Sequence, residues 1–336
     1  MILVIAEKPS VAQSIAKVLG ATSRKDGYME GGNYIVSWCF GHLVELADAS
    51  SYDERYAKWR YDDLPIVPES WMFEVTKDKA QQFKVLSALM KDKRVIELVC
   101  ATDAGREGEL IFRLVYDKAG CTKPFKRLWI SSLEDSAIRE GFNHLRDGKE
   151  YDRLYEAALS RSKADWIVGI NGTRLFTTLY HKKLVVGRVQ TPTLAMLVER
   201  DGKISTFQKE KYFNVHVGKG DLTADLEKVK TEEEAKRIAA ACEKKQAVVS
   251  SLKRETKTVN PPRLYDLTTL QREANRYYGF TAQQTLDLVQ TLYEKKLLTY
   301  PRTDSQFITD DMENTARQVI SIVCRQLPLF SGVSVT

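Results

Sequence analysis

Apolar and polar positions along the first 150 residues follow two alternating patterns, short apolar runs and segments with apolar residues every three or four positions. The opening run from Met1 to Ala6 is followed by Val11, Ile15 and Leu19, the pattern of a buried strand leading into a helix. Further strands are expected at 33–40, 95–101 and 127–130, and helices at 79–90, 110–118 and 135–145. Strands that alternate with helices predict an α/β layer with a largely parallel sheet.

The pattern becomes mainly helical after residue 150. Apolar residues recur at helical spacing over 151–183 and 194–198, a strand is expected at 212–217, and Thr231 precedes three glutamates that mark a helix start. A basic segment then ends in two prolines, and helices at 264–278 and 281–295 precede a strand at 297–300, an order that resembles a winged-helix-like unit. The expected fold class is multidomain, α/β plus mainly α, with segments 1–150, 151–210, 211–260 and 261–336.

Carboxylates follow two of the predicted strands. Glu7 comes directly after the first strand, and Asp103 and Glu107 follow the strand at 95–101. Sites in open α/β sheets form at the carboxyl ends of strands, so these carboxylates converge if the two strands are neighbours. Hard oxygen ligands of this kind suit Mg²⁺. The alternative is an ordinary acidic helix start, where Asp and Glu favour the positive end of the helix dipole.

The run Tyr300-Pro301-Arg302 joins a candidate nucleophile to a phosphate-binding group. A tyrosine hydroxyl can act as a covalent nucleophile in a site that stabilises the charge involved. A guanidinium two residues further on can reach the phosphate that the tyrosine attacks. The alternative is a strand-end tyrosine packed in a core, with Arg302 in solvent.

Arginines in the first 190 residues are candidates for contacts with single-stranded DNA. Arg161, Arg174 and Arg188 fall in the helical region, and Arg60 lies beside a tryptophan. Proteins that bind single strands combine a basic groove with aromatic stacking platforms. The alternative for each arginine is a solvated helix face, and Trp166 is more often a core residue.

Five blocks of the sequence, taken together, resemble the type IA DNA topoisomerases. The blocks run in the family's order from Met1 to about Arg317, and the first two look like the halves of a Toprim domain. They are Glu7-Lys8-Pro9-Ser10; Thr102-Asp103-Ala104-Gly105-Arg106-Glu107-Gly108-Glu109; Arg161-Ser162-Lys163-Ala164-Asp165-Trp166 with Gly169-Ile170-Asn171-Gly172-Thr173-Arg174; Val186-Gly187-Arg188-Val189-Gln190-Thr191-Pro192-Thr193-Leu194; and Tyr300-Pro301-Arg302-Thr303-Asp304-Ser305.

The resemblance implies an ATP-independent enzyme in which Tyr300 attacks single-stranded DNA and forms a 5′-phosphotyrosine link. By the same resemblance Arg302 stabilises the charge on the phosphate, Lys8 helps to protonate the leaving 3′ oxygen, and Glu7 holds the scissile region or a metal. Asp103 and Glu107 hold Mg²⁺. The implied substrates are negatively supercoiled or catenated DNA, with a helicase as a further partner and a cytoplasmic, nucleoid-associated location. The implied DNA-binding residues are Arg60, Arg161, Arg174, Gly187, Arg188, Val189, Gln190, Thr191 and Pro192.

Two features depart from the family's pattern. Its acidic motif is usually Asp-x-Asp-x-Glu, and Gly105 stands at the second aspartate, which puts a two-metal arrangement in doubt. Members are usually longer, so 151–210 is expected to be the first part of a helical single-strand DNA-binding domain and 211–260 the first part of a β arch. Segment 261–336 is expected to be a truncated tyrosine domain, and the chain alone should not pass strands. The alternatives are a catalytically incomplete single-strand-binding fragment and another Toprim enzyme, a primase or a nuclease.

Composition narrows the class of protein further. The 336 residues exceed one typical domain, and a net charge of +6 is compatible with nucleic acid without requiring it. Five scattered cysteines without a Cys-x-x-Cys pair argue against a zinc ribbon or a disulfide framework. No apolar run approaches transmembrane length and no signal peptide is read, so a cytoplasmic protein without a membrane partner is expected.

Overall fold

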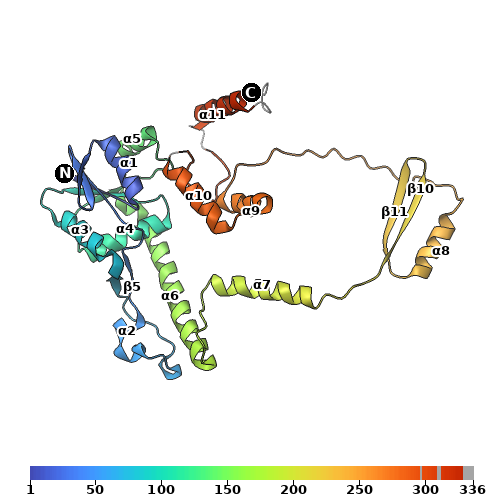
Figure 1. Ribbon diagram of the computed structural model, residues 1–336, viewed down its shortest axis with the longest axis horizontal. Coiled ribbons are helices and arrows are strands. Elements are labelled where there is room, and N and C mark those ends of the chain that lie inside the picture. The colour runs from blue at the N-terminus through green and yellow to red at the C-terminus, as the bar shows by residue number, and fades with distance from the viewer. Residues whose placement is uncertain (296, 309–311, 328–336) are drawn as a thin grey trace. The chain divides into compact units, whose positions relative to one another are not determined.

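The computed structural model describes residues 1–295, 297–308 and 312–327. The chain forms two compact units, one made of Met1–Arg188 with Pro262–Thr336 and the other of Val189–Pro261 (Figure 1). The expected boundary at residue 150 does not separate compact units, because Ala158 of the following helix belongs to the core of the sheet domain. The expected boundary at 210 likewise lies inside the second unit.

The first unit is built on a seven-stranded mixed sheet. Its strand order is β2-β3-β4-β1-β7-β8-β9, in which β4, β1, β7 and β8 run parallel and the outer pairs are antiparallel. The parallel centre confirms the α/β prediction, and β4 corresponds to the strand expected at 33–40, whereas the antiparallel strands β2 and β3 were not predicted. The strands are β1 (Ile2–Ala6), β2 (Ser23–Lys25), β3 (Tyr28–Gly31), β4 (Tyr34–Trp38), β7 (Glu97–Ala101), β8 (Phe125–Arg127) and β9 (Arg146–Asp147).

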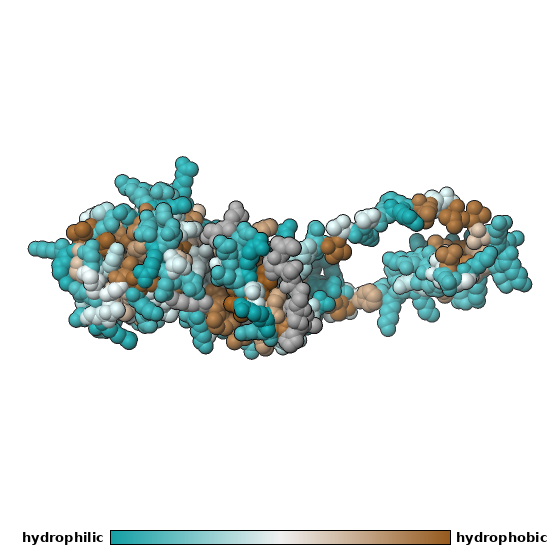
Figure 2. Space-filling view, turned by 90° about the horizontal axis from the view of Figure 1, so that it is seen from above, coloured by the Kyte–Doolittle hydropathy of each residue, from teal (hydrophilic) through white to brown (hydrophobic). Residues whose placement is uncertain are grey.

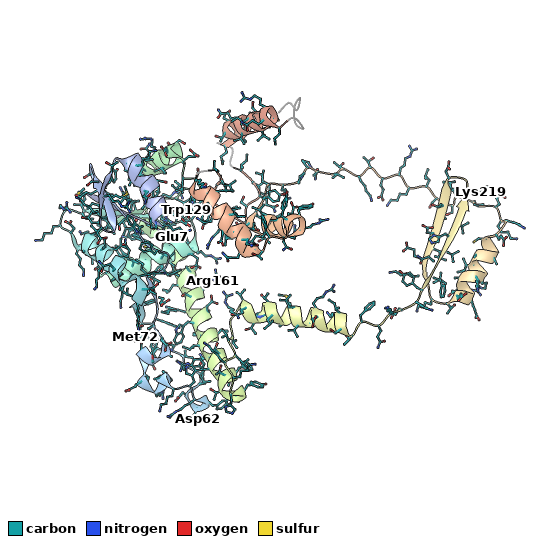
Figure 3. The ribbon with its side chains drawn as sticks, viewed as in Figure 1. Glu7, Asp62, Met72, Trp129, Arg161 and Lys219 are labelled. Atoms are coloured by element: carbon teal, nitrogen blue, oxygen red, sulfur yellow. The ribbon has the colours of Figure 1, made fainter. Side chains whose placement is uncertain are left out.

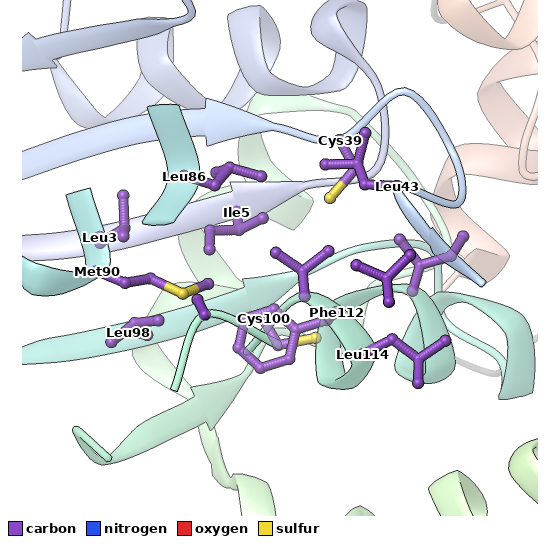
Figure 4. Close-up of a cluster of buried hydrophobic side chains, with 14 of the residues drawn as sticks. Leu3, Ile5, Cys39, Leu43, Leu86, Met90, Leu98, Cys100, Phe112 and Leu114 are labelled. Carbon is purple, nitrogen blue, oxygen red and sulfur yellow. The ribbon is translucent and has the colours of Figure 1, made fainter. Parts of the chain in front are cut away.

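Apolar side chains of β1 alternate between the two faces of this sheet. Leu3 and Ile5 belong to one core cluster, which also includes Leu86 and Phe112 (Figure 4), and Val4 belongs to a second cluster. A central parallel strand is covered on both faces, which is why its sequence is a continuous apolar run. The first cluster includes residues of α3 (Ala80–Lys91) and α4 (Arg106–Lys118), and the second includes residues of α1 (Pro9–Leu19) and α5 (Asp135–Asn143).

A long helix and an irregular arm extend from the sheet domain. The helix is α6 (Asp152–Tyr180), and the arm lies between β5 (Val44–Leu46) and β6 (Phe73–Val75) and contains α2 (Ala49–Tyr52). Tyr56 and Ile66 of the arm share a small core with Trp166 of α6. The Asn171 amide accepts a hydrogen bond from Ile66 N (2.6 Å) and donates one to Ile66 O (2.8 Å), which fixes the arm along the helix.

The second unit consists of one isolated helix and a hairpin covered by another helix. Val215, Val229 and Ala235 form its core. The predicted strand at 212–217 and the helix after Thr231 are confirmed, and the partner strand β11 was missed. Its elements are α7 (Gln190–Ser205), β10 (Phe213–Lys219), β11 (Leu222–Val229) and α8 (Glu232–Cys242).

The segment after Pro262 returns to the first unit as α9 (Leu267–Tyr278), α10 (Ala282–Glu294) and α11 (Glu313–Gln326). Thr281 forms a capping box with Gln284 at the start of α10, which corresponds to the helix expected at 281–295. The expected strand at 297–300 is not formed among its described residues 297–300, whose backbone bends; Tyr300 N donates instead to Ser131 O (3.2 Å). Apolar side chains remain exposed in both units (Figure 2). In the part of the chain that the structure describes, no helix is both long enough and apolar enough to cross a bilayer.

Candidate active site

Glu7 and Asp103 meet at the carboxyl ends of β1 and β7. The two strands pair in parallel, with Ala6 opposite Ala101, so the residues that follow them share one edge of the sheet. The Glu7 carboxylate (Figure 3) accepts a hydrogen bond from Asp103 N (3.3 Å). Burial and the Asp103 charge raise the pKa of Glu7 to about 7, and burial raises the pKa of Asp103. Two carboxylates that resist ionisation side by side form a site that favours a proton or a cation.

Tyr300 approaches the same acids from a segment almost 200 residues further along the chain. Its hydroxyl donates a hydrogen bond to the Asp103 side chain, and its ring packs edge-on against Tyr293 with 5.6 Å between centroids. Burial, followed by the charges of Asp103 and Glu7, raises the pKa of the Tyr300 phenol above its usual value. The phenol is therefore protonated here, with a carboxylate as its acceptor.

Two cations face this group of acids. Lys8 and Arg302 both lower the pKa values of Glu7 and Asp103 through their charge, and Arg302 acts in the same direction on Tyr300. Lys8 Nζ also lies 4.0 Å from the Glu294 carboxylate of α10, while Arg302 is exposed. The four residues predicted to be catalytic, Tyr300, Arg302, Lys8 and Glu7, thus lie near one another, and Asp103 lies among them.

Glu107 lies in the first turn of α4 but its carboxylate has other partners. It is 3.5 Å from His42 Nε2 and 3.5 Å from Arg161 Nη1 of α6. Among the residues described, no three His, Cys, Asp or Glu side chains form a group that could hold a metal ion. The structure therefore brings Glu7 and Asp103 together and leaves Glu107 paired with basic side chains.

Asp165 joins two of the predicted DNA-binding arginines. Its carboxylate accepts from Arg188 Nε at 2.5 Å and lies 3.8 Å from Arg161 Nε, so a chain of ion pairs leads from Glu107 along α6 to Arg188 (Figure 3 labels Arg161). Asp165 was missed as a functional candidate. Its four-residue spacing from Arg161 on a helix is the sequence signal that could have found it.

Arg174 has a structural position instead of the expected contact with DNA. Its side chain is only 4% exposed, Nη1 donates to Tyr56 O (2.7 Å), and the guanidinium stacks on Trp59. Trp166 has the core position that was the alternative to a DNA-stacking role, because it packs with the arm's small core and its indole N–H donates to Ala47 O. Arg60, by contrast, is exposed on the arm.

The remaining predicted DNA-binding residues divide between the two units. Gly187 and Arg188 end the first part of unit one. Val189, Gln190, Thr191 and Pro192 belong to the second unit, where Val189 precedes α7 and its carbonyl accepts from Thr193 N (3.2 Å). All four are exposed at the start of that helix.

The two glycines of the acidic loop have different structural roles. Gly105 is extended (φ 177°, ψ 176°), and a Cβ atom added there would meet nothing within 4 Å. A Cβ atom on Gly108 would lie 2.1 Å from Asp103 O. Gly108 therefore allows the first turn of α4 to approach the Asp103 backbone, whereas Gly105 leaves open space where the family's pattern has a carboxylate.

The donor set fits one Mg²⁺ ion bound mainly by ligands from outside the protein. Mg²⁺ is usually held by one or two carboxylates, with water and substrate phosphates completing its shell. Glu7 and Asp103 supply two neighbouring carboxylates, and the burial and mutual repulsion that raise the pKa of Glu7 would be offset by a nearby positive charge. Glu107 as a third ligand stays a prediction.

Comparisons with known proteins agree with the five sequence blocks. A Toprim domain model matches residues 2–133, and a DNA topoisomerase model matches residues 149–331. DNA topoisomerase 3 of Bacillus subtilis (strain 168) is 46% identical over 323 residues, which are 94% of this chain and 44% of that protein. The enzyme of the same name from Staphylococcus haemolyticus is 46% identical over 320 residues, 94% of this chain and 45% of its own.

A solved structure shares the architecture. Full-length topoisomerase I from Thermotoga maritima matches 96% of this chain and 52% of its own, with a TM-score of 0.67 and 25% identity. The chain spans less than half the length of the two curated relatives above. The DNA topoisomerase match covers more than half of the residues and lies outside the Toprim domain, which speaks against a primase or nuclease. The chain therefore belongs to the type IA DNA topoisomerase family.

Proposed function

We propose that this chain carries the strand-cleaving centre of a type IA topoisomerase. The Tyr300 oxygen attacks a phosphodiester of single-stranded DNA, the bond from phosphorus to the 3′ oxygen breaks, and the DNA remains attached through a 5′-phosphotyrosine. The phenolic proton passes to Asp103, which accepts its hydrogen bond. Lys8 supplies a proton to the leaving 3′ oxygen, and religation reverses each step.

The charges around Tyr300 support this assignment. Attack builds negative charge on the phosphate oxygens, and Arg302 presents a guanidinium beside the nucleophile to stabilise it. Burial raises the pKa of Asp103, which makes its carboxylate a better proton acceptor than an exposed aspartate. The hydrogen bond from Tyr300 to Asp103 is the single observation that carries the proposal, because it joins the Toprim acids to the tyrosine.

Mg²⁺ bound by Glu7 and Asp103 would supply positive charge beside the scissile phosphate. The protein's own part is to hold these two partly buried carboxylates side by side at one sheet edge. No Gly-x-x-x-x-Gly-Lys-Ser/Thr loop occurs in the sequence, which agrees with a reaction that conserves the phosphodiester energy and uses no ATP.

Arg161 and Arg188 are proposed to bind the DNA backbone. Both guanidiniums are partly exposed and are held by Asp165, so phosphate oxygens could replace carboxylates as their partners. Arg60 and the residues from Gly187 to Pro192 are proposed to extend this contact. Relaxation of negatively supercoiled DNA, or decatenation, is proposed for the whole protein to which this sequence belongs.

Adduct formation tests the proposal directly. The protein is incubated with Mg²⁺ and single-stranded DNA radiolabelled along its length, quenched with denaturant, and resolved for a covalent protein–DNA band. We expect a band for the wild type, none for Tyr300→Phe, and an undiminished band for Tyr293→Phe. Tyr293 is the matched control because it is a buried tyrosine whose ring packs against Tyr300.

Two results separate this proposal from its rival. A wild-type band that survives Tyr300→Phe assigns the nucleophile elsewhere and refutes the proposal. Binding of single-stranded DNA by the wild type without any adduct, at Mg²⁺ up to tens of millimolar, instead supports a binding fragment that lacks cleavage activity.

A further inference from the structure

A buried arginine lies directly beneath the loop that carries Asp103. Arg127, the last residue of β8, is 0% exposed, and its guanidinium points at the carboxyl end of β7. Nη1 donates to Cys100 O (3.0 Å), Thr102 O (2.7 Å) and Leu128 O (2.8 Å), and Nη2 donates to Asp103 O (2.7 Å). One side chain therefore holds the carbonyls at the point where β7 leaves the sheet and turns toward the site.

The counter-charge for this arginine comes from the helix that follows the loop. Glu109 of α4 is also 0% exposed; its Oε2 lies 3.1 Å from Arg127 Nε, and its Oε1 accepts from Arg113 Nε (2.9 Å). Arg113 Nη2 in turn donates a hydrogen bond to Asp152 Oδ1 at the start of α6 (2.6 Å). The loop from 102 to 105 is thus flanked by a charged pair: Glu109 lies on α4, which follows the loop, and Arg127 lies on β8, which pairs with β7.

A contribution to folding stability does not by itself account for the buried ion pair of Arg127 and Glu109. Removing two ions from water costs several kcal/mol, and well-packed apolar residues often serve a core equally well. What apolar residues cannot do is bind carbonyl groups that have left the sheet ladder, and buried carbonyls need a donor. The same backbone is confined from the other side, because Gly108 packs against Asp103 O and Thr102 Oγ1 donates to Gly108 O (2.7 Å).

We propose that Arg127 is a positioning residue that fixes the backbone of Asp103, so that the Asp103 carboxylate stays against Glu7 and Tyr300. Arg127 touches neither DNA nor the reacting atoms in this arrangement; it acts through the carbonyls of residues 100, 102 and 103. The consequence for cleavage rests on the proposed function. The consequence for the order of the loop does not rest on it, and the consequence for cation binding requires only that Asp103 is a cation ligand, not that the chain cleaves DNA.

The test compares two conservative substitutions that both touch Glu109. Arg127→Lys keeps a charge for Glu109 but cannot reach all four carbonyls, since an ammonium has a single nitrogen. Arg113→Lys disturbs Glu109 from the opposite side and leaves the Asp103 loop contacts in place, so it is the matched control. Hydrogen–deuterium exchange of peptides covering residues 100–108 is measured without metal. Mn²⁺ binding is then measured by electron paramagnetic resonance.

For Arg127→Lys we expect at least tenfold faster exchange in that segment and Mn²⁺ binding weakened about 10- to 100-fold, the range typical of residues that orient metal ligands. Adduct formation should recover at high Mn²⁺. Arg113→Lys should stay within about twofold of wild type in exchange and in Mn²⁺ affinity. If Arg127→Lys does not fold, Glu109→Gln, which keeps the side-chain shape but removes the counter-charge, is measured with the same expectations.

The proposal is overturned if the folded Arg127→Lys protein exchanges and binds Mn²⁺ like the wild type, or if Arg113→Lys changes both as much. Failure of the proposed function gives a different result. In that case the wild type forms no adduct, while Arg127→Lys still exchanges faster over residues 100–108 and binds Mn²⁺ more weakly than the wild type.

Discussion

Replacing Gly108 by alanine should destabilise the protein, although alanine is the better helix former. Gly108 is the third residue of α4, and exchanging glycine for alanine inside a helix usually stabilises it by about 0.5–1 kcal/mol. Here the added methyl would lie 2.1 Å from Asp103 O and 3.0 Å from both Asp103 C and Asp103 N. Contacts below 3.0 Å are essentially never made by real Cβ atoms, so the backbone has to move.

The movement required is large for this part of the molecule. Ordinary contact begins at 3.4 Å, so the methyl and the Asp103 carbonyl must separate by about 1.3 Å. The neighbouring atoms are backbone, and Arg127 holds the same carbonyl at 2.7 Å. Overpacking of this kind costs about 1–3 kcal/mol, and a strained hydrogen bond to a charged donor adds to that cost. We expect a net loss of about 2 kcal/mol, which lowers the melting temperature by about 4–8 °C.

Gly105→Ala provides the matched control within the same loop. Gly105 has extended backbone and open space, so alanine there should change stability by less than about 1 kcal/mol and in the stabilising direction. Urea unfolding and thermal melting of the three proteins, with Mn²⁺ binding as a local readout, make the comparison. The reasoning is refuted if Gly108→Ala is as stable as Gly105→Ala and binds Mn²⁺ equally well.

Three further predictions concern the charges of the site and the arm. Gly105→Asp should tighten Mn²⁺ binding measured by calorimetry, because a third carboxylate enters open space without backbone strain; equal or weaker binding by the folded variant would show that position 105 does not face the cation. In EDTA, stability to urea should fall as pH rises from about 4.5 to about 7, because the folded state holds the Glu7 proton more tightly than the unfolded chain does. Glu7→Gln should flatten that slope, and an unchanged slope would remove Glu7 as its cause. Arg174→Ala should cost about 2–3 kcal/mol in urea unfolding through loss of a buried charged donor, whereas exposed Arg60→Ala should stay within about 0.5 kcal/mol; equal losses would contradict the structural position given to Arg174.

The position of Glu7 and Asp103 could be predicted because it depends on local rules. Each follows a continuous apolar run, and parallel neighbours place their carboxyl ends at one edge. The approach of Tyr300 to Asp103 has no such rule behind it. Spacing along the chain cannot bring together residues almost 200 positions apart, so that expectation came from the family resemblance. The predicted strand before Tyr300 is not formed: among the described residues 297–300, Leu297 N donates back to Leu292 O and Tyr300 N donates to Ser131 O, and neither bond belongs to a strand ladder.

Side-chain partners from distant segments explain where the structure differs from the other sequence predictions. Periodicity places Arg174 on a helix but cannot show that the arm covers it, since its acceptor Tyr56 lies 118 residues earlier. Glu107 has the right spacing from Asp103 for a shared site, yet His42 and Arg161 reach its carboxylate first. Arg127 is an arginine in a short strand, and nothing in the sequence distinguishes it from a surface residue.

The charges of the acidic site determine how a cation and a DNA phosphate would bind there together. Two partly buried carboxylates with raised pKa values lie near one lysine and one arginine, and a DNA phosphate would add a further negative charge to the same space. A site with a complete carboxylate cage would repel that phosphate more strongly. Gly105 stands in place of an aspartate and Glu107 pairs with His42 and Arg161, and in the described part of the chain Asp103 and Glu7 are the carboxylates that act on Tyr300. Much of the shell of a bound Mg²⁺ would then be left for water and phosphate oxygens. Cation binding and DNA binding at this site should therefore favour each other, since each supplies the charge or the ligands that the other lacks.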